Sequence, residues 1–161
     1  MTSPAKTAST RPASVADRAA LFRLLEAANL PLAGLPEDLE SFVVAEVRGR
    51  VVAAAGLELY GESALLRSVV VDPECQGTGI GRRIVSEALE LARGRGAEEV
   101  FLLTTTAQDW FPRFGFSRED RSRVPQPMLE SAEFRGACPA SAVLMRLRLG
   151  RPAGLSIAAG G

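Results

Sequence analysis

Three glycines on alternate positions lie in the run from Gln76 to Arg82, which reads QGTGIGR. A β-branched apolar stretch, Leu65 to Val71, precedes the run, and Asp72-Pro73 ends it as a strand would end. The apolar spacing that follows predicts a helix from about Gly79 to Arg93. A strand, a glycine-rich turn and a helix in this order present backbone N–H groups and a positive helix end to an anion. This stretch is therefore predicted to bind the pyrophosphate of a cofactor.

Two common cofactor fingerprints do not fit this run. A dinucleotide fingerprint that starts at Gly77 needs its third glycine where Arg82 stands, and Gly81 comes one position early. A Walker loop ends in Gly-Lys-Ser/Thr, but no lysine follows Lys6. A tight strand–helix turn without any ligand is the structural alternative.

The composition excludes several function classes. The 161 residues include 19 basic and 19 acidic side chains, which gives no electrostatic footprint for nucleic acid. No apolar run reaches the ~20 residues of a membrane helix, and Met1 to Lys6 lacks an apolar signal core, so we expect a cytoplasmic protein. The absence of histidine removes Ser-His and Cys-His pairs. Cys75 and Cys138 have no partner in metal spacing, so no metal is expected.

The remaining elements predict a mixed sheet with helices, an α+β or α/β fold. One helix has Leu21, Leu24, Leu25 and Ala28 on a single face, and a second short helix is expected from Leu35-Pro36-Glu37. A short helix is also predicted from Ala107 to Phe114. Strands are predicted at 9–11, 42–47, 51–59, 65–71, 100–104 and 142–149. We expect one domain over residues 9–149, with a flexible start (1–8) and a disordered tail (150–161).

The glycine run resembles motif A of the GCN5-related N-acetyltransferases, the GNAT superfamily. The family pattern Gln/Arg-x-x-Gly-x-Gly/Ala matches at Gln76, Gly79 and Gly81. Later motifs, Leu102 to Ala107 and Trp110 to Phe116, are similar to the acetyltransferase domain of bacterial N-acetylglutamate synthases. The arsenic-resistance type of N-acetyltransferase is still closer. That resemblance spans Arg11 to Ala13, Gly56 to Glu58, Leu65 to Ser68, Leu102 to Ala107, and Glu133-Phe134 with Cys138-Pro139-x-Ser141-Ala142.

The resemblance implies a GNAT fold: a mixed, mostly antiparallel sheet of six to seven strands, helices on both faces, and a splay after the fourth strand. It implies acetyl-CoA as co-substrate. The implied cofactor-binding residues are Val69, Val70, Val71, Gln76, Gly77, Thr78, Gly79, Ile80, Gly81, Arg82 and Phe111. Many members place a tyrosine where Phe111 stands, and that tyrosine protonates the departing thiolate. Phe111 cannot donate a proton, and we expect the only tyrosine, Tyr60, in a different loop.

The family reaction needs a group that deprotonates the acceptor amine and a donor that polarises the thioester carbonyl. A backbone N–H around Val69 suits the second task. Glu58 is the first candidate for the base, because its strand is expected to pair with the strand of Val69. A solvent-facing strand carboxylate is the alternative for Glu58. Glu133 is the second candidate, and a surface helix charge is the favoured interpretation of that residue.

Arg67 interrupts an apolar strand, and a buried guanidinium needs an anion. It either pairs permanently with Glu58 or clamps the α-carboxylate of an amino-acid acceptor. Thr104 and Thr105 are candidates for the same acceptor site, although strand threonines are common. Cys138 is interpreted as a small buried residue.

We therefore predict an acetyl-CoA-dependent N-acetyltransferase for a small amine, an amino acid or an amino-acid-like arsenical. Protein or peptide acetylation and a non-catalytic acyl-CoA sensor are the alternatives. No nucleic-acid or membrane partner is expected, and a homodimer is compatible with the sequence.

Overall fold

The computed structural model describes residues 8–150, and these form two compact units. Unit 1 comprises residues 8–57 and 67–88, and unit 2 comprises residues 58–66 and 89–150. The predicted flexible start and disordered tail lie almost entirely outside the described residues.

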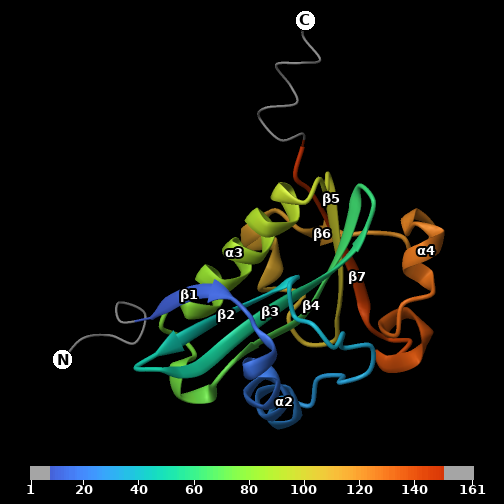
Figure 1. Cartoon of the computed structure of the whole chain (residues 1–161). Coiled ribbons are helices and arrows are strands. Elements are labelled where there is room, and N and C mark those ends of the chain that lie inside the picture. The colour runs from blue at the N-terminus through green and yellow to red at the C-terminus, as the bar shows by residue number, and fades with distance from the viewer. Residues whose placement is uncertain (1–7, 151–161) are drawn as a thin grey trace, which may run out of the picture. The chain divides into compact units, whose positions relative to one another are not determined.

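Seven strands form a mixed sheet in the order β1-β2-β3-β4-β5-β7-β6 (Figure 1). Their bounds are β1 Ser9–Pro12, β2 Phe42–Val47, β3 Arg50–Tyr60, β4 Ser63–Val71, β5 Glu99–Thr104, β6 Ser117–Arg118 and β7 Val143–Arg148. The mixed sheet of six to seven strands that the GNAT resemblance implied is confirmed, and β6 is the strand that the residue patterns did not indicate.

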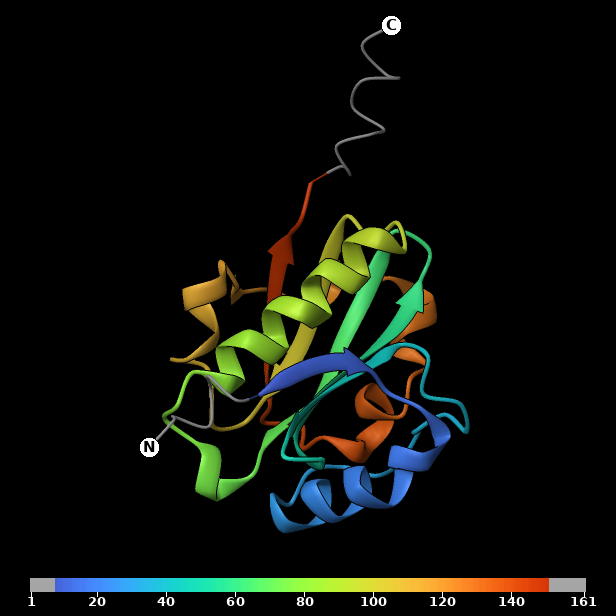
Figure 2. The ribbon, with the colours of Figure 1, turned by 60° about the vertical axis from the view of Figure 1, so that its left-hand side comes forward.

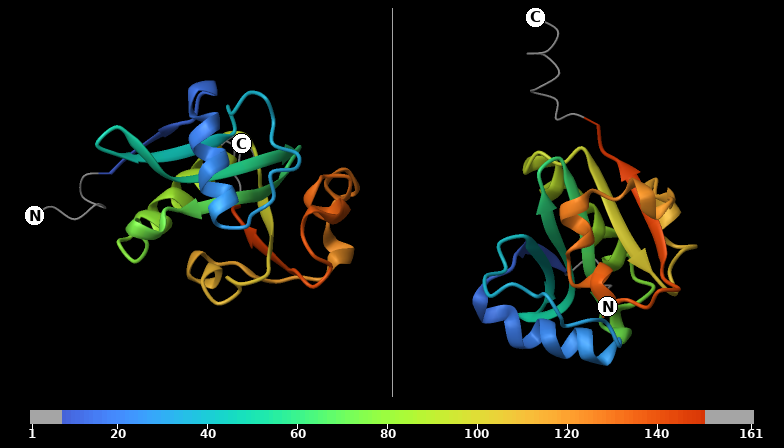
Figure 3. Two further views of the ribbon diagram at one scale, coloured as in Figure 1. Left: turned by 90° about the horizontal axis from the view of Figure 1, so that it is seen from below. Right: turned by 90° about the vertical axis from the view of Figure 1, so that its right-hand side faces the viewer.

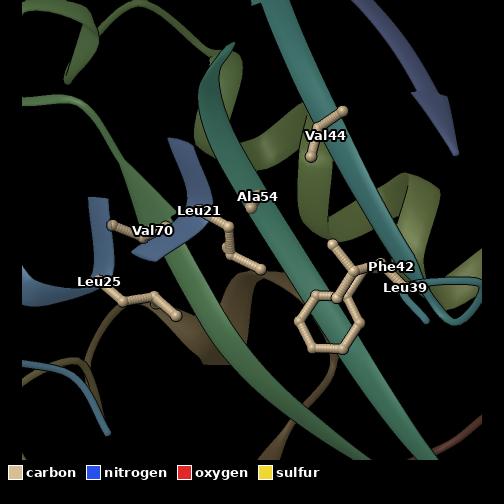
Figure 4. Close-up of a cluster of buried hydrophobic side chains, with 7 residues drawn as sticks. All are labelled: Leu21, Leu25, Leu39, Phe42, Val44, Ala54 and Val70. Atoms are coloured by element: carbon tan, nitrogen blue, oxygen red, sulfur yellow. The ribbon is translucent and has the colours of Figure 1, made fainter. Parts of the chain in front are cut away.

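In unit 1, β1 pairs antiparallel with β2, and β2 pairs antiparallel with β3. Helix α2 (Arg18–Ala27) follows a 3-10 turn whose N-cap residue is Ser14, and the Asp17 carboxylate accepts from the Ser14 N–H at 2.8 Å, as in a capping box. Leu21 and Leu25 of α2 are fully buried and point at the strands in Figure 4. Unit 1 thus has its own hydrophobic core, made by Leu21, Leu25, Leu39, Phe42, Val44, Ala54 and Val70.

In unit 2, β4 pairs parallel with β5, and β5 pairs antiparallel with β7 along its whole length (right panel of Figure 3). The β4–β5 register covers three residue pairs and ends at Leu65 and Phe101. Both strands continue beyond that point, to Val71 and Thr104. Pairing that stops partway along two strands is the splay that the GNAT resemblance implied.

Helix α3 (Ile80–Gly94) is the longest helix in the described part of the chain and is uninterrupted in Figure 2. Ile80, Ile84 and Ala88 are buried at the predicted spacing. The first nine residues of the helix belong to unit 1 and the rest to unit 2. No helix among residues 8–150 is long and apolar enough to cross a membrane.

Two predicted helices are wrong or shortened. Residues 28–41 form turns and bends, so the helix expected from Leu35 is absent there. The Pro36 carbonyl accepts from the Arg18 guanidinium instead of from a helical N–H. The Leu39 side chain is buried in the unit 1 core. The helix expected over 107–114 is reduced to the 3-10 turn Phe111–Phe114.

Candidate functional site

The predicted site residues are divided between the two units. Unit 1 carries Arg67, the end of β4, the glycine loop and the start of α3. Unit 2 carries Glu58, Thr104, Thr105, Phe111 and Glu133.

The end of β4 contains an unusual backbone conformation. Ser68 lies inside the strand with φ of +58°, the left-handed region that residues other than glycine seldom occupy. A left-handed residue inside a strand bends it and interrupts the ladder, as a bulge does. Such strain persists where the surroundings impose it, and it concentrates at functional sites. It directly precedes Val69, the residue predicted to polarise the thioester carbonyl.

After β4, local hydrogen bonds shape the loop. The carboxylate of Asp72 accepts from the Glu74 N–H at 2.9 Å, and the side-chain amide of Gln76 donates to the Val71 carbonyl at 3.2 Å. The Thr78 hydroxyl donates to the carbonyl of Cys75. Gln76 and Thr78 therefore serve to hold the turn, whatever they contact in a complex.

The glycines are required by the backbone. Gly77 has φ of +78° and Gly79 has φ of +94°, and no described atom lies within 4 Å of where a Cβ would stand on either. The first α-helical bond runs from the Arg83 N–H to the Gly79 carbonyl at 3.1 Å. The N–H groups of Ile80, Gly81 and Arg82 precede that bond, so they have no partner within the helix. The loop thus combines an approachable main chain with a positive helix end, and that combination fits a phosphate-bearing ligand.

The two arginines of the first turn differ. Arg83 donates to the Ala8 carbonyl at 2.6 Å, which ties α3 to the start of β1. Arg82 is exposed. Of the pair, Arg82 is the better candidate for a cofactor phosphate.

A cavity of about 460 Å³ lies in unit 1 beside the last residues of β4. Val70, Val71, Asp72 and Gln76 are among the residues that line it, together with residues of α2. Arg50, also in the lining, pairs with Asp72 at 2.9 Å. The end of β4 therefore borders open volume next to the glycine loop.

Arg67 is buried, with 2% of its surface exposed. Its Nη2 donates to the Ala33 carbonyl at 2.8 Å and reaches the Pro31 carbonyl at 3.5 Å, while its Nε donates to Ser68 at 3.1 Å. These bonds fasten the irregular 28–41 segment to β4 and hold the residue that has the left-handed conformation. No local sequence pattern indicates this anchoring role.

In unit 2, Glu58 and Tyr60 are joined. Both belong to β3, and the Tyr60 hydroxyl donates to Glu58 Oε1 at 2.5 Å. The expectation that Tyr60 lies in a loop is wrong, because β3 continues to Tyr60 and the turn begins at Gly61. The Glu-x-Tyr spacing within a strand was the signal that could have revealed the pair, since alternate residues share a face.

The other unit 2 candidates have diverse surroundings. The Thr104 hydroxyl accepts from the Ala107 N–H at 2.9 Å, and Thr105 is exposed. Phe111 is 6% exposed, and its ring lies 5.0 Å from Trp110 and 5.8 Å from Phe116. It is a packed member of an aromatic cluster.

Glu133 contradicts its favoured interpretation. It is 5% exposed and lies in the π-helical turn Glu133–Ala137, so it is not a surface charge. Burial of a carboxylate is costly and is kept where the group has a partner or a role, so Glu133 remains a candidate for the acceptor site. Cys138 is half-buried, less enclosed than predicted. No group of His, Cys, Asp and Glu side chains within residues 8–150 is arranged to hold a metal ion.

Comparison with known proteins identifies the family. Residues 38–118, half of the chain, match the acetyltransferase (GNAT) domain family. The amino-acid acetyltransferase of Neisseria meningitidis serogroup A is 32% identical over 114 residues, which cover 67% of this chain and 26% of that relative. The chain therefore spans about a quarter of the length of that relative.

Two solved structures share the fold. The N-acetylglutamate synthase of Neisseria gonorrhoeae, complexed with coenzyme A and N-acetyl-glutamate, has a TM-score of 0.77 at 24% identity and covers 89% of this chain and 35% of its own. Rv2747 of Mycobacterium tuberculosis, in complex with CoA and NLQ, has a TM-score of 0.76 at 28% identity and covers 88% of this chain and 99% of its own. The predicted fold and the predicted similarity to N-acetylglutamate synthases are confirmed.

Proposed function

Since this chain belongs to the acetyltransferase (GNAT) domain family, we propose that it transfers the acetyl group of acetyl-CoA to the primary amine of a small acceptor. The observation that carries the proposal is the continuous segment from Ser68 to Arg82. It joins a strained strand end, a glycine loop that faces open space, and a helix start with N–H groups ahead of the first helical bond.

The cofactor side is proposed from main-chain groups. Residues Val69 to Val71 would pair with the pantetheine amides as an added strand pairs with a sheet edge. The N–H groups from Gly77 to Gly81 and the Arg82 guanidinium would hold the pyrophosphate. Phe111 would contribute apolar contact. CoA in the complex of Rv2747, which matches this chain over nearly the whole of both, supports this assignment.

The chemical step is proposed as direct attack by the acceptor amine. Acetyl-CoA, when bound, supplies the thioester that is attacked. The Val69 N–H would polarise its carbonyl oxygen, and the Glu58 carboxylate would take a proton from the acceptor ammonium, directly or through water. With Phe111 in place of a proton donor, the departing thiolate would take its proton from water.

The acceptor is proposed to be an amino acid or an amino-acid-like compound. The amino-acid acetyltransferase relative supports this class, and the resemblance of Leu102 to Ala107 to arsenic-resistance enzymes extends it to amino-acid arsenicals. Arg67 would orient the acceptor carboxylate, with Thr104, Thr105 and Glu133 as further contacts.

Thiol release from acetyl-CoA tests this proposal. The purified chain would be assayed with a panel of amino acids that includes glutamate, with amino-acid arsenicals and with short peptides. We expect turnover with at least one free amino acid or arsenical and a loss of about 100-fold in kcat for Glu58→Gln. Turnover with peptides alone would favour protein acetylation. Acetyl-CoA binding without turnover would favour the acyl-CoA sensor, which Phe111 makes the second candidate.

A further inference from the structure

Tyr60 has a hydroxyl that donates to a carboxylate oxygen of Glu58 at 2.5 Å. We propose that Tyr60 is a positioning residue, which holds the Glu58 carboxylate in the orientation that proton abstraction needs. The inference rests on the proposed function, in which Glu58 is the base.

The strand geometry brings the two side chains together. Glu58 and Tyr60 are alternate residues near the end of β3, so both side chains leave the same face of the strand. Both residues are half-buried. A hydroxyl that donates to a carboxylate forms a charge-assisted bond, and such bonds are shorter and about twice as strong as neutral ones.

The ring of Tyr60 is itself anchored. It packs against the buried cluster of unit 2, which comprises Leu65, Phe101, Val124, Met128 and Leu144. A packed tyrosine ring has only two side-chain torsions, and packing fixes both. Glutamate has three, and each glutamate torsion that stays free lets its carboxylate occupy more positions. Because the Tyr60 ring is fixed by packing, its hydroxyl restricts the Glu58 carboxylate to the positions in which the hydrogen bond can form. Positioning of this kind matters because a misplacement of 1 Å in a catalytic group can lower the rate about 100-fold.

The alternative is that the Glu58–Tyr60 bond only stabilises the end of β3. Unit 2 contains a matched bond with which to separate the two roles: the Ser63 hydroxyl donates to Glu99 at 2.5 Å, also in a partly buried pair. Ser63 and Glu99 are no part of the proposed site. Removing the Ser63 hydroxyl should cost stability without affecting catalysis.

The test is a double-mutant cycle with Tyr60→Phe, Glu58→Gln and the double variant, with Ser63→Ala as control. We expect Tyr60→Phe to lower kcat about 10-fold and to leave the KM values of acetyl-CoA and acceptor within about twofold. In the Glu58→Gln background the same change should have no further effect on kcat, because the group that Tyr60 positions is gone. Ser63→Ala should keep the wild-type kcat.

A second variant covers the case in which Tyr60→Phe folds poorly. Glu58→Asp keeps a carboxylate but shortens it by one methylene, so the Tyr60 bond is lost while the ring stays packed, and kcat should again fall about 10-fold. The inference is overturned if Tyr60→Phe keeps kcat within twofold, or if it lowers kcat equally in the wild-type and Glu58→Gln backgrounds. A wild-type protein without turnover would instead reject the proposed function and this inference with it. A fully active Glu58→Gln variant would reject Glu58 as the base, and with it this inference, but would leave the proposed acetyl transfer in place.

Discussion

The two regions that carry the proposed site residues are made of different groups. The glycine-loop side, residues 69–82, offers mainly backbone: a bent strand, two glycines with positive φ and the N–H groups at the start of α3. The other proposed residues, Glu58, Thr104, Thr105 and Glu133, belong to unit 2 and offer side chains from strand ends and turns. A backbone site depends on conformation, so it tolerates few changes at glycines and many elsewhere. A side-chain site depends on which group stands at each position, and that is where acceptor choice can vary.

The largest expected change in a kinetic constant follows from substitution of Gly79. Gly79→Ala forces a side chain into a left-handed conformation on the face that would approach the cofactor, and we expect the KM of acetyl-CoA to rise about 30-fold or more. Steady-state kinetics with varied acetyl-CoA would measure this rise.

Gly49 is the matched control. It has φ of +78°, no described atom within 4 Å of the position that a Cβ would take, and a place in the turn between β2 and β3, outside the proposed site. Gly49→Ala should cost about 1 kcal/mol of unfolding free energy, as should Gly79→Ala, but leave the KM of acetyl-CoA unchanged. If both variants shifted this KM alike, the backbone of residues 69–82 would not be the cofactor side.

Arg67 is the point in unit 1 at which a side chain should affect the acceptor. Arg67→Ala removes the bonds to Ala33 and Ser68 and the proposed carboxylate clamp, so we expect the acceptor KM to rise at least about 10-fold and the KM of acetyl-CoA to change less than about threefold. Arg67→Lys keeps the charge but lacks the planar guanidinium, so its acceptor KM should lie between those of the wild type and Arg67→Ala. Equal losses for both substrates would mean that Arg67 is an anchor of residues 28–41 only.

One ion pair in unit 1, between Arg11 and Asp17, should make the free energy of unfolding depend on pH without affecting the KM of either substrate. The Arg11 guanidinium, which bonds Asp17 at 2.8 Å, lowers the pKa of that carboxyl from 3.8 to about 2. Because the folded pKa is the lower one, the stabilisation is complete above pH 3.8 and disappears as the pH falls through about 2. Asp17→Asn should therefore cost about 1 to 2 kcal/mol at pH 7 and almost nothing at pH 2, measured by urea unfolding. A gap that persisted at pH 2 would contradict this assignment, and both KM values should stay at wild-type levels.

The smallest expected effect is a difference in alkylation rate between two cysteines, one from each unit. Cys75 is buried, and its burial, followed by the charges of Asp72 and Glu74, raises the pKa of its thiol. Cys138 is half-buried. We expect iodoacetamide to label Cys138 at least several-fold faster at pH 7.5, as followed by peptide mass spectrometry. Cys138→Ser serves as control and should leave only the slow reaction. Faster labelling of Cys75 would mean that the loop after β4 opens readily.

The strand, glycine turn and helix of residues 65–94 were predictable because their signals are local. Alternate glycines, a β-branched strand before them and a helical stripe after them depend on backbone sterics and on periodicity within about 30 residues. The strands flanking the Arg48-Gly49 turn were predictable for the same reason. The left-handed Ser68 was not, because serine has no preference that signals it, and the packing around β4 imposes it.

The 28–41 segment and Glu133 were less predictable because their decisive contacts link distant positions. The helix expected at Leu35 fails since that segment gives carbonyls to Arg18 and Arg67. Glu133 is buried although its local sequence, with charged neighbours, is typical of a surface turn.

The sequence by itself determined the family and the order of strand, glycine turn and helix over residues 65–94, because glycine conformation and hydrophobic periodicity are properties of short segments. Only the tertiary structure decided that Arg67 bonds the main chain of residues 31–33, that Glu133 is buried, and that Tyr60 holds Glu58. Burial and hydrogen-bond partners depend on which segments pack together, and that is a property of the whole fold.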